Sequence, residues 1–559
     1  PMSRAGLLLL LLLLPAAGRA LGEALRPQYP KASCKASGSR PGSSLDRLRW
    51  KAPRGGGGGG GLAATATPMD LDQRSRRAGS VVAVSAALGS LLQGFDTGII
   101  GGALLFIIPE FQLADRPYLQ GLMVTSSTMG AIGGTVLASK LSDAIGRRST
   151  LLSASSLFIT SSLLMAWAPN VNVLLGARAM MGLAIGQASS VVPVYIAECA
   201  DAKQRGALAT IPQLCISSGI MLAYTVAFVA TMLNKSWRLM VGLALVPSLL
   251  QCLCLLMLPE SPRWLLSRAK TPEDRDKALH ALAWLRGVKD QPDLVAQELA
   301  TIEEGLQQTA PRTTDKAAAE ARGPRQGWGA LLHEKALRQR LAVCMTLQMF
   351  QQVTGINAVV YFTPQILKEA GVPQLFSRIG LTENSASLLA TALAYMPKIP
   401  ALFFAMSLMD RMGRRRLLQV FVPLMGVCLA SLCSVFSFMQ PGAAIPGVVA
   451  LISICLYGSF FVLSLGPIPN IISAELFPLR ARSAAMAGSL GSQFVFNTLV
   501  GMAFPILRHT FGTQVVFGGF ATMCVLCWLY VNRFVPETRG ASLEDLTEGD
   551  GGKGSAATA

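Results

Sequence analysis

The chain has 559 residues, of which 51% are hydrophobic and only 14% are charged, a composition that excludes an average soluble globular protein and indicates a polytopic membrane protein. The net charge of +18 would suit nucleic-acid binding, but residues 1–80 carry 13 Lys and Arg against 4 Asp and Glu, and the remaining excess lies largely in short loops. That distribution is typical of the positive-inside rule, so we expect no nucleic-acid partner.

The N-terminal segment 1–79 is predicted to be a disordered or targeting extension. A run of eight leucines begins at Leu7 and is typical of a signal or transit peptide, whereas residues 15–68 are rich in Arg, Ser and Gly, with seven consecutive glycines from Gly55. Met69 stands just before the first apolar segment, so the residues before it are, as an equal alternative, a stretch upstream of the mature protein.

Twelve apolar windows predict twelve membrane helices, because about 20 apolar residues span roughly 30 Å of hydrocarbon. The windows lie near residues 81–107, 119–139, 149–168, 171–197, 207–231, 238–258, 339–366, 385–408, 417–439, 445–472, 484–507 and 513–534. A polar linker divides six windows from six, and the expected parts are an N-terminal half at 80–258, the linker at 259–337, a C-terminal half at 338–535 and a tail at 536–559. Lys and Arg gather in the loops after even-numbered helices, which places both termini and the linker in the cytosol. The predicted fold class is an all-α polytopic membrane protein built from two six-helix halves.

The linker is predicted to form short amphipathic helices under the bundle. Thr271 and Pro272 precede two acidic residues, as in a capped helix start with proline at the first helical position. Leu279, Leu282 and Leu285 follow at helical spacing.

The two halves repeat a charged loop and a glutamate at a helix end. The segment 142–148 after the second helix recurs as 409–415 after the eighth, each ending in Gly-Arg-Arg, and a Glu with an Arg seven residues later follows both the fourth and the tenth helix. The members of these predicted salt-bridge clusters are Asp143, Arg147, Arg148, Glu198 and Arg205 in the first half, and Arg414, Arg415, Glu475 and Arg482 in the second. Repeated halves are typical of transporters whose site forms at the membrane midplane, between halves that rock against each other. Positive-inside topology alone is the alternative explanation of the arginines.

Two opposite charges lie inside the predicted helices, Asp96 in the first and Arg178 in the fourth. A charge at the centre of a spanning helix costs roughly 2.5–3.5 kcal/mol on insertion scales, so such residues usually pair, face a cavity and serve transport or proton transfer. The three histidines lie outside the centres of the segments, so proton chemistry within the membrane would rest on carboxylates. A purely structural ion pair is the alternative.

Five motifs occur in one order along the chain. They are the charged loop at 142–148, the run from Pro193 to Glu198, Pro-Glu-Ser-Pro-Arg at 259–263, the run from Gln351 to Asn357 and Pro-Glu-Thr-Arg-Gly at 536–540. Together they resemble the sugar porter family of the major facilitator superfamily, over about residues 80–545. Segments 92–96, 237–240, 361–367 and 466–470 are most similar to plant and algal tonoplast monosaccharide transporters.

The resemblance implies a sugar site made of amide side chains. The family's sugar-contacting positions are matched by Gln213, Gln351, Gln352 and Asn357, and Asn470 stands where animal facilitators typically carry a tryptophan. An amide both donates and accepts hydrogen bonds, which suits sugar hydroxyls without adding charge. Hydrogen bonding between helices is the alternative for each of them.

The resemblance also implies an aromatic gate and exposes a departure from the family. Tyr361 and Phe362 match the pair that closes over the sugar, although aromatic residues near a helix end are commonly interfacial. Lys398 lies near a position where many members carry asparagine, and it is either a snorkelling residue or a third intramembrane charge.

The function implied is proton-coupled transport of a monosaccharide of the glucose or fructose type by alternating access. Proton-coupled members resemble this chain in placing Asp96 opposite Arg178, and in the family the Gly-Arg-Arg and Glu pairs tie the halves together in the outward-open state.

The expected partners are the sugar, protons and the lipid bilayer. The protein is expected to be a monomer in the vacuolar membrane, with the plasma membrane or the plastid envelope as alternatives. No enzymatic activity, cofactor or metal is expected. A facilitative uniporter and a non-transporting sugar sensor are the rival functions.

Overall fold

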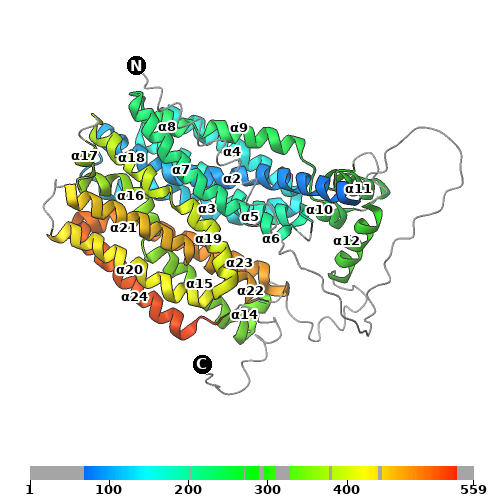
Figure 1. Cartoon of the computed structure of the whole chain (residues 1–559). Coiled ribbons are helices and arrows are strands. Elements are labelled where there is room, and N and C mark those ends of the chain that lie inside the picture. Colours follow the sequence, from blue (N-terminus) through cyan, green and yellow to red (C-terminus); the bar gives the residue numbers. More distant parts are fainter. Residues whose placement is uncertain are drawn as a thin grey trace, which may run out of the picture. The chain divides into compact units, whose positions relative to one another are not determined.

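Helices make up most of the chain that the structure describes (Figure 1). The structure is a computed structural model, and it describes residues 68–201, 204–269, 271–288, 295–309, 328–376, 380–438, 444–477 and 479–537. Contacts divide the chain into two units, Pro1–Thr65 and Ala66–Ala559, and every helix named below belongs to the second unit. Most of the predicted N-terminal extension and of the predicted tail lies outside the described residues.

The first half contains its six membrane segments in the predicted order. They are formed by α2 (Pro68–Glu110), α3 (Pro117–Ile145), α4 (Arg147–Trp167), α5 (Val171–Cys199), α6 (Arg205–Leu208) with α7 (Ile211–Met232), and α8 (Trp237–Gly242) with α9 (Leu245–Met257). The first helix starts at Pro68, before the apolar window at 81–107, and its first turns are therefore made largely of polar residues.

The second half follows the same plan with more interruptions. Its segments are α15 (Lys335–Val353) with α16 (Ile356–Glu369), α18 (Glu383–Tyr395) with α19 (Lys398–Met412), α20 (Arg414–Phe438), α21 (Ala444–Leu463) with α22 (Ile468–Glu475), α23 (Leu479–Phe511) and α24 (Thr513–Phe534). A short helix, α17 (Val372–Leu375), joins α16 to α18. Proline stands at or beside the interruptions after α18 and α21, where it cannot donate a helical hydrogen bond.

Eleven helical spans among the described residues are long and apolar enough to cross a membrane, and they match eleven of the twelve predicted windows. The remaining window, 339–366, is occupied by α15 and α16 as two helices. Gly355 separates them in a left-handed conformation with φ of 93°, and a Cβ there would lie 2.5 Å from the ring of Phe520. The hydroxyl of Tyr457 donates to the carbonyl oxygen of Thr354 at 3.0 Å, which satisfies one backbone group that the break exposes.

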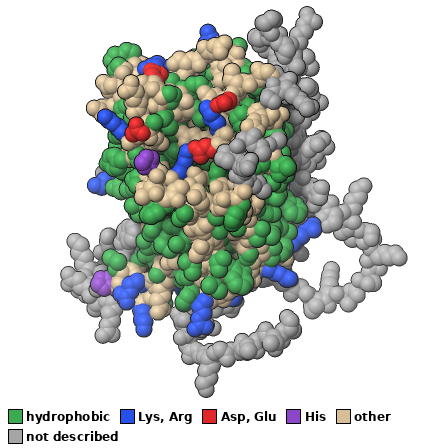
Figure 2. All heavy atoms as spheres, turned by 90° about the vertical axis from the view of Figure 1, so that its left-hand side faces the viewer, with side chains coloured by type: hydrophobic (Ala, Val, Ile, Leu, Met, Phe, Trp, Pro, Cys, Tyr) green, Lys and Arg blue, Asp and Glu red, His purple; other side chains and the backbone are tan. Residues whose placement is uncertain are grey.

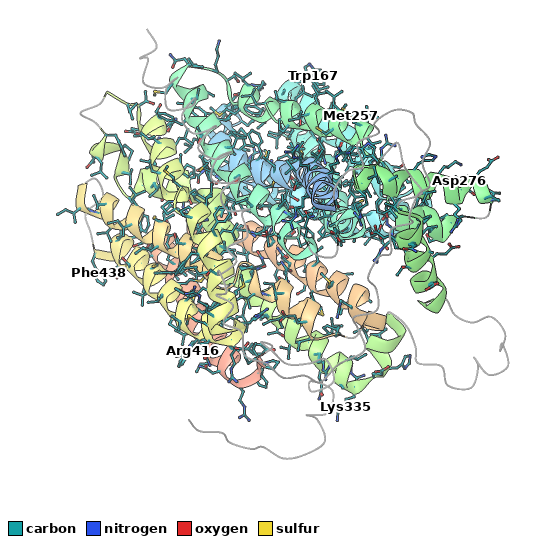
Figure 3. The ribbon with its side chains drawn as sticks, turned by 45° about the vertical axis from the view of Figure 1, so that its right-hand side comes forward. Trp167, Met257, Asp276, Lys335, Arg416 and Phe438 are labelled. Atoms are coloured by element: carbon teal, nitrogen blue, oxygen red, sulfur yellow. The ribbon has the colours of Figure 1, made fainter. Side chains whose placement is uncertain are left out.

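Large apolar side chains cover the outside of this bundle. Trp167, Met257 and Phe438 point away from it, with exposed fractions of 70%, 79% and 87% (Figure 3). In water such a surface would be unfavourable, whereas in a bilayer it contacts lipid.

Glycines bring α3 and α5 into close contact. A Cβ at Gly182 would lie 2.0 Å from the carbonyl oxygen of Ser127, and one at Gly130 would lie 2.1 Å from that of Ala179. Small residues at such interfaces allow membrane helices to pack backbone against backbone. This close approach matters for the site because carbonyl groups of α3 come within reach of side chains on α5.

We expect Gly182→Val to lower the melting temperature of the detergent-purified protein strongly, because the new side chain would force α3 and α5 apart. Overpacking of this kind costs about 1–3 kcal/mol. Gly176→Val on the same helix is the matched control, since no atom lies within 4 Å of a Cβ at that position. Equal melting temperatures for the two variants would contradict the assigned packing.

The linker forms the short helices that its sequence predicts. They are α10 (Pro262–Arg268), α11 (Pro272–Leu285), α12 (Ala296–Thr309) and α14 (Trp328–His333). The Thr271 side chain caps α11 by accepting from the backbone of Asp274, as predicted. Trp264 and Arg268 of α10 donate to the carbonyl oxygen of Asp143 at 3.1 and 2.6 Å, so α10 docks on the last turn of α3. We call this end of the bundle the linker end.

The contacts between the two halves run from the middle of the bundle toward the end away from α10–α12 (Figure 1). Thr498 of α23 donates to Thr128 of α3 at 3.1 Å, and a Cβ at Gly121 would lie 2.8 Å from the carbonyl oxygen of Met502. The hydroxyl of Tyr224 in α7 donates to the carbonyl oxygen of Val360 in α16. The halves therefore meet at the end opposite the linker.

Acidic and basic side chains lie next to one another on the face at that opposite end (Figure 2). Lys368 pairs with Glu383 at 3.3 Å, and Arg508 pairs with Glu369. A pocket with residues of both halves lies here, and its lining includes none of the predicted sugar-binding residues.

Candidate transport site

The structure brings Asp96 of α2 and Arg178 of α5 together as a buried ion pair. The Arg178 Nη1 to Asp96 Oδ1 distance is 3.0 Å and the Nη2 to Oδ2 distance is 3.4 Å, with exposed side-chain fractions of 1% and 4%. Arg178 also donates to two α3 carbonyl oxygens, those of Met123 at 2.6 Å and Val124 at 3.3 Å. The guanidinium thus has partners on several sides, whereas the carboxylate has Arg178 as its hydrogen-bond partner among the described residues. Protonation of Asp96 would therefore weaken its main attachment.

Three of the predicted sugar-binding amides form a chain across the break between α15 and α16. Gln352 donates to Gln351 at 2.8 Å and accepts from Asn357 at 2.5 Å. Gln351 donates in turn to the carbonyl oxygens of Leu465 and Gly466, at 2.7 and 3.0 Å, where α21 gives way to α22. Two interrupted helices are thereby joined by amide groups that suit a sugar's hydroxyls.

The other two predicted amides are placed apart from this chain. Asn470 of α22 is exposed and accepts from Gln348 at 2.7 Å. Gln213 lies half-buried on α7, in the first half, and makes no side-chain hydrogen bond to another described residue. Gln213 would join a site only across the space between the halves.

Sequence reasoning missed four amides whose oxygen atoms are buried without a hydrogen-bond partner in the described chain. They are Gln251 of α9, Gln348 of α15, and Gln493 and Asn497 of α23. An unpaired buried acceptor is costly unless a ligand or water supplies a donor. The signal was present, because Gln493 and Asn497 are four residues apart in an apolar helix and therefore share one of its faces.

The predicted gate residues are buried, which argues against an interfacial role. Tyr361 is 3% and Phe362 is 1% exposed. The Phe362 ring stacks on Phe504 of α23 with a centroid distance of 4.9 Å. The Tyr361 carbonyl faces α2, where a Cβ at Gly101 would lie 2.5 Å from its oxygen. Tyr361 therefore lies between the halves, while Phe362 packs within its own half.

The first arginine of each Gly-Arg-Arg motif pairs with the predicted glutamate. Arg147 binds Glu198 through two contacts of 3.1 and 3.2 Å, and Arg414 binds Glu475 at 2.9 Å. Arg147 also contacts Asp143, at 3.3 Å. Each pair joins residues of a single half, so in this conformation the pairs do not tie the halves together as the resemblance implies.

The second arginine of each motif binds a backbone carbonyl group. Arg148 donates to Leu255 at 2.8 Å, and Arg415 donates to Asn532 at 2.6 Å. The predicted pairing of these arginines with the glutamates is thus replaced by contacts with the last turns of α9 and α24. Arg482 donates to the carbonyl oxygen of Phe477 at 3.2 Å, and the Arg205 side chain lies outside the described residues.

Two further glutamates repeat between the halves and were missed as functional groups. The backbone N–H groups of both arginines in the first motif donate to Glu260, at 2.9 and 3.0 Å, and those in the second motif donate to Glu537, at 3.0 and 3.1 Å. A carboxylate at a helix N-terminus satisfies unpaired N–H groups and complements the helix dipole. The sequence signal was the recurring Pro-Glu after the sixth and twelfth helices.

We expect Glu475→Gln to slow turnover more than it weakens sugar binding, because the partly exposed pair with Arg414 is worth about 1 kcal/mol, or roughly fivefold in the balance of conformations. Sugar counterflow and equilibrium binding measured on the same preparation separate the two effects. Glu303→Gln is the control, since Glu303 pairs with Arg275 at 3.2 Å in the linker, outside both clusters, and its side chain is 38% exposed. If the Glu475 variant turns over normally, the arginines of the Gly-Arg-Arg motifs only set the topology of the chain in the membrane.

Two repeated bundles, a buried charge pair and interrupted helices lined with amides define a membrane transporter of the major facilitator fold. Residues 82–549 match the family described as Sugar (and other) transporter, and the chain belongs to that family. It is therefore a multi-pass sugar transporter rather than an enzyme, as the sequence predicted.

Individual relatives agree with this assignment. The probable metabolite transport protein CsbC of Bacillus subtilis is 34% identical over 460 residues, covering 82% of this chain and 92% of that protein. The probable polyol transporter 6 of Arabidopsis thaliana is 33% identical over 476 residues, covering 83% and 92%. The inward-open structure of the xylose transporter XylE from E. coli superposes with a TM-score of 0.67 at 28% identity, covering 83% of this chain and 98% of that chain.

Proposed function

We propose that this sugar transporter couples the movement of a monosaccharide to protons by alternating access, with Asp96 as the carboxylate that takes up the proton. The buried pair of Asp96 and Arg178 carries the proposal. An ionised Asp96 holds α2 against α5 through Arg178, and a protonated one has lost the charge that makes this contact strong. Proton binding thus shifts the balance between two arrangements of the helices.

The sugar is proposed to be a hexose of the glucose or fructose type, bound by amides from both halves. The chain of Gln351, Gln352 and Asn357 supports this, because its members bond one another through amide groups that can exchange those bonds for bonds to sugar hydroxyl groups. The unpaired oxygen atoms of Gln348 and Asn497 add two acceptors. A bound sugar that also reaches Gln213 would link the halves, which is the requirement for closing around it.

The conformational cycle proposed is a rocking of the two halves about this site. Their contacts lie toward the end opposite the linker, and the similarity to an inward-open structure supports assigning the same state to this arrangement. In the outward-open state the contacts of Tyr361 and Thr498 with the first half would be broken. We further propose that the transporter works as a monomer in the vacuolar membrane.

The test is uptake of labelled glucose, fructose and xylose into proteoliposomes that contain the full chain, with and without an imposed pH gradient. Accumulation above equilibrium that depends on the gradient and disappears with a protonophore is the expected result. Equilibration at the same rate in both conditions would favour a facilitative uniporter. Binding of sugar without any flux would favour a sensor.

A further inference from the structure

Lys398 is a buried cation that the proposed proton coupling does not use. It is the first residue of α19, follows the interruption at Pro397, and is 8% exposed. It lies inside the membrane span Glu383–Met409. Among the described residues no carboxylate lies within ion-pair distance of its ammonium group, in contrast to Arg178. A charge in such a place is costly and usually serves a function.

The surroundings of Lys398 hold its ammonium group at a defined place. The Nζ atom lies 3.7 Å from the ring centroid of Tyr395, a cation–π contact that offsets part of the cost of burial. On its other side α21 presents Gly458, where a Cβ would lie 2.2 Å from the Cε atom of Lys398 and 3.0 Å from Nζ. Any larger residue at position 458 would displace the lysine.

Helix α21 links this lysine to the amide chain. Tyr457 and Gly458 are neighbours, and while Gly458 contacts Lys398, Tyr457 donates to the carbonyl oxygen of Thr354 at the break between Gln352 and Asn357. Adjacent residues of a helix point about 100° apart, so Lys398 and the break at Thr354 lie on neighbouring sides of α21.

A hydroxyl group without a partner completes the arrangement. The hydroxyl of Tyr395 is buried and lacks a hydrogen-bond partner in the described chain, and its ring lies 5.1 Å from that of Tyr224. Tyr224 itself donates to the carbonyl oxygen of Val360 in α16. The ammonium group of Lys398 and the hydroxyl of Tyr395 therefore lie together at the break between α18 and α19, and both are groups that bind a carboxylate.

Resting on the proposed function, we propose that Lys398, with Tyr395, binds the carboxylate of an acidic monosaccharide, so that the transporter prefers a sugar acid such as a hexuronate to the neutral hexose. One ammonium group balances one carboxylate. A sugar phosphate carries about −1.5 to −2 charges at pH 7, which a single lysine leaves partly uncompensated. The amides would then bind the hydroxyl groups that a hexuronate and a hexose share.

The test compares glucuronate with glucose as competitors of labelled-sugar counterflow by the full chain in proteoliposomes, supported by direct binding to the purified protein. We expect the parent to prefer glucuronate by about tenfold or more, the effect of one charge-assisted hydrogen bond. In Lys398→Gln the ratio of the two affinities should fall by about 10- to 100-fold. Lys140→Gln, an exposed lysine at the linker end of α3, is the control and should keep the parent ratio.

A second variant covers the case in which Lys398→Gln fails to fold. Gly458→Ala keeps every charge but displaces the ammonium group, so the preference for glucuronate should fall in this variant as well. A parent that binds glucose at least as well as glucuronate would overturn this inference and leave the proposed function standing. Stronger competition by glucose 6-phosphate than by glucuronate would overturn the carboxylate assignment. A parent that binds none of these sugars would overturn both proposals.

Discussion

Replacing Asp96 with Asn is expected to abolish accumulation of sugar against its gradient while sugar exchange across the membrane continues. The amide has nearly the shape of the carboxylate and still accepts a hydrogen bond, but it cannot bind the proton that the cycle must carry. Arg178 keeps its bonds to the carbonyl oxygens of Met123 and Val124. Removing one partner of a buried pair nevertheless costs about 3–5 kcal/mol, so the yield of folded protein should fall.

Accumulation and exchange are measured on the same proteoliposomes, with uptake under a pH gradient compared to counterflow without one. Glu110→Gln is a matched control on the same helix, because Glu110 pairs with Arg238 at 2.7 Å but its side chain is 40% exposed. The control should accumulate sugar like the parent. An Asp96→Asn variant that still concentrates sugar would remove Asp96 from the coupling step.

The course of the chain through the membrane was predictable because hydrophobic length and positive loops are local properties of the sequence. Eleven windows became continuous or nearly continuous spans. The seventh window was predicted as one helix, but it carries Arg340 and four glutamines along its first half and Gly355 near its centre. Phe520 packs against Gly355 and Tyr457 bonds the carbonyl oxygen of Thr354 at the break, and both are more than 100 residues away in sequence.

The pairing of Asp96 with Arg178 was also predictable, but the other hydrogen bonds of Arg178 were not. The rule that intramembrane charges pair selected Asp96 and Arg178. The two bonds from Arg178 to carbonyl groups of α3 depend on how closely α3 and α5 approach, which Gly130 and Gly182 decide. Sequence spacing within a helix contains no information about that approach, so these partners became visible only in three dimensions.

The charged loops show the same limit. The repeat predicted which glutamate follows which Gly-Arg-Arg motif, and the first arginine of each motif does bind it. Sequence alone could not distinguish the two neighbouring arginines. In a helix they point about 100° apart, so the second one faces the ends of α9 and α24 and binds their carbonyl groups.

Gln352→Ala is expected to weaken the apparent affinity for hexose by about five- to a hundredfold, because unpaired polar groups in a dry site cost roughly 1–3 kcal/mol. Gln352 is the middle member of the amide chain, and its removal takes away the donor to the Gln351 side-chain oxygen and the acceptor of the Asn357 side-chain nitrogen. Competition of labelled-sugar counterflow gives the affinity, and the melting temperature of the purified protein shows whether folding has changed. We expect the affinity for hexose to fall clearly while the melting temperature changes little.

Gln419→Ala provides the matched control for this prediction. Gln419 of α20 donates to Asn532 of α24 at 2.8 Å, so the variant removes an amide–amide bond of the same length in the same half, between helices that the proposed site does not include. That variant should lower the melting temperature at unchanged affinity for hexose. If both variants lower the melting temperature and neither changes the affinity, then the amide chain only joins the interrupted helices, and the sugar must be bound by other residues.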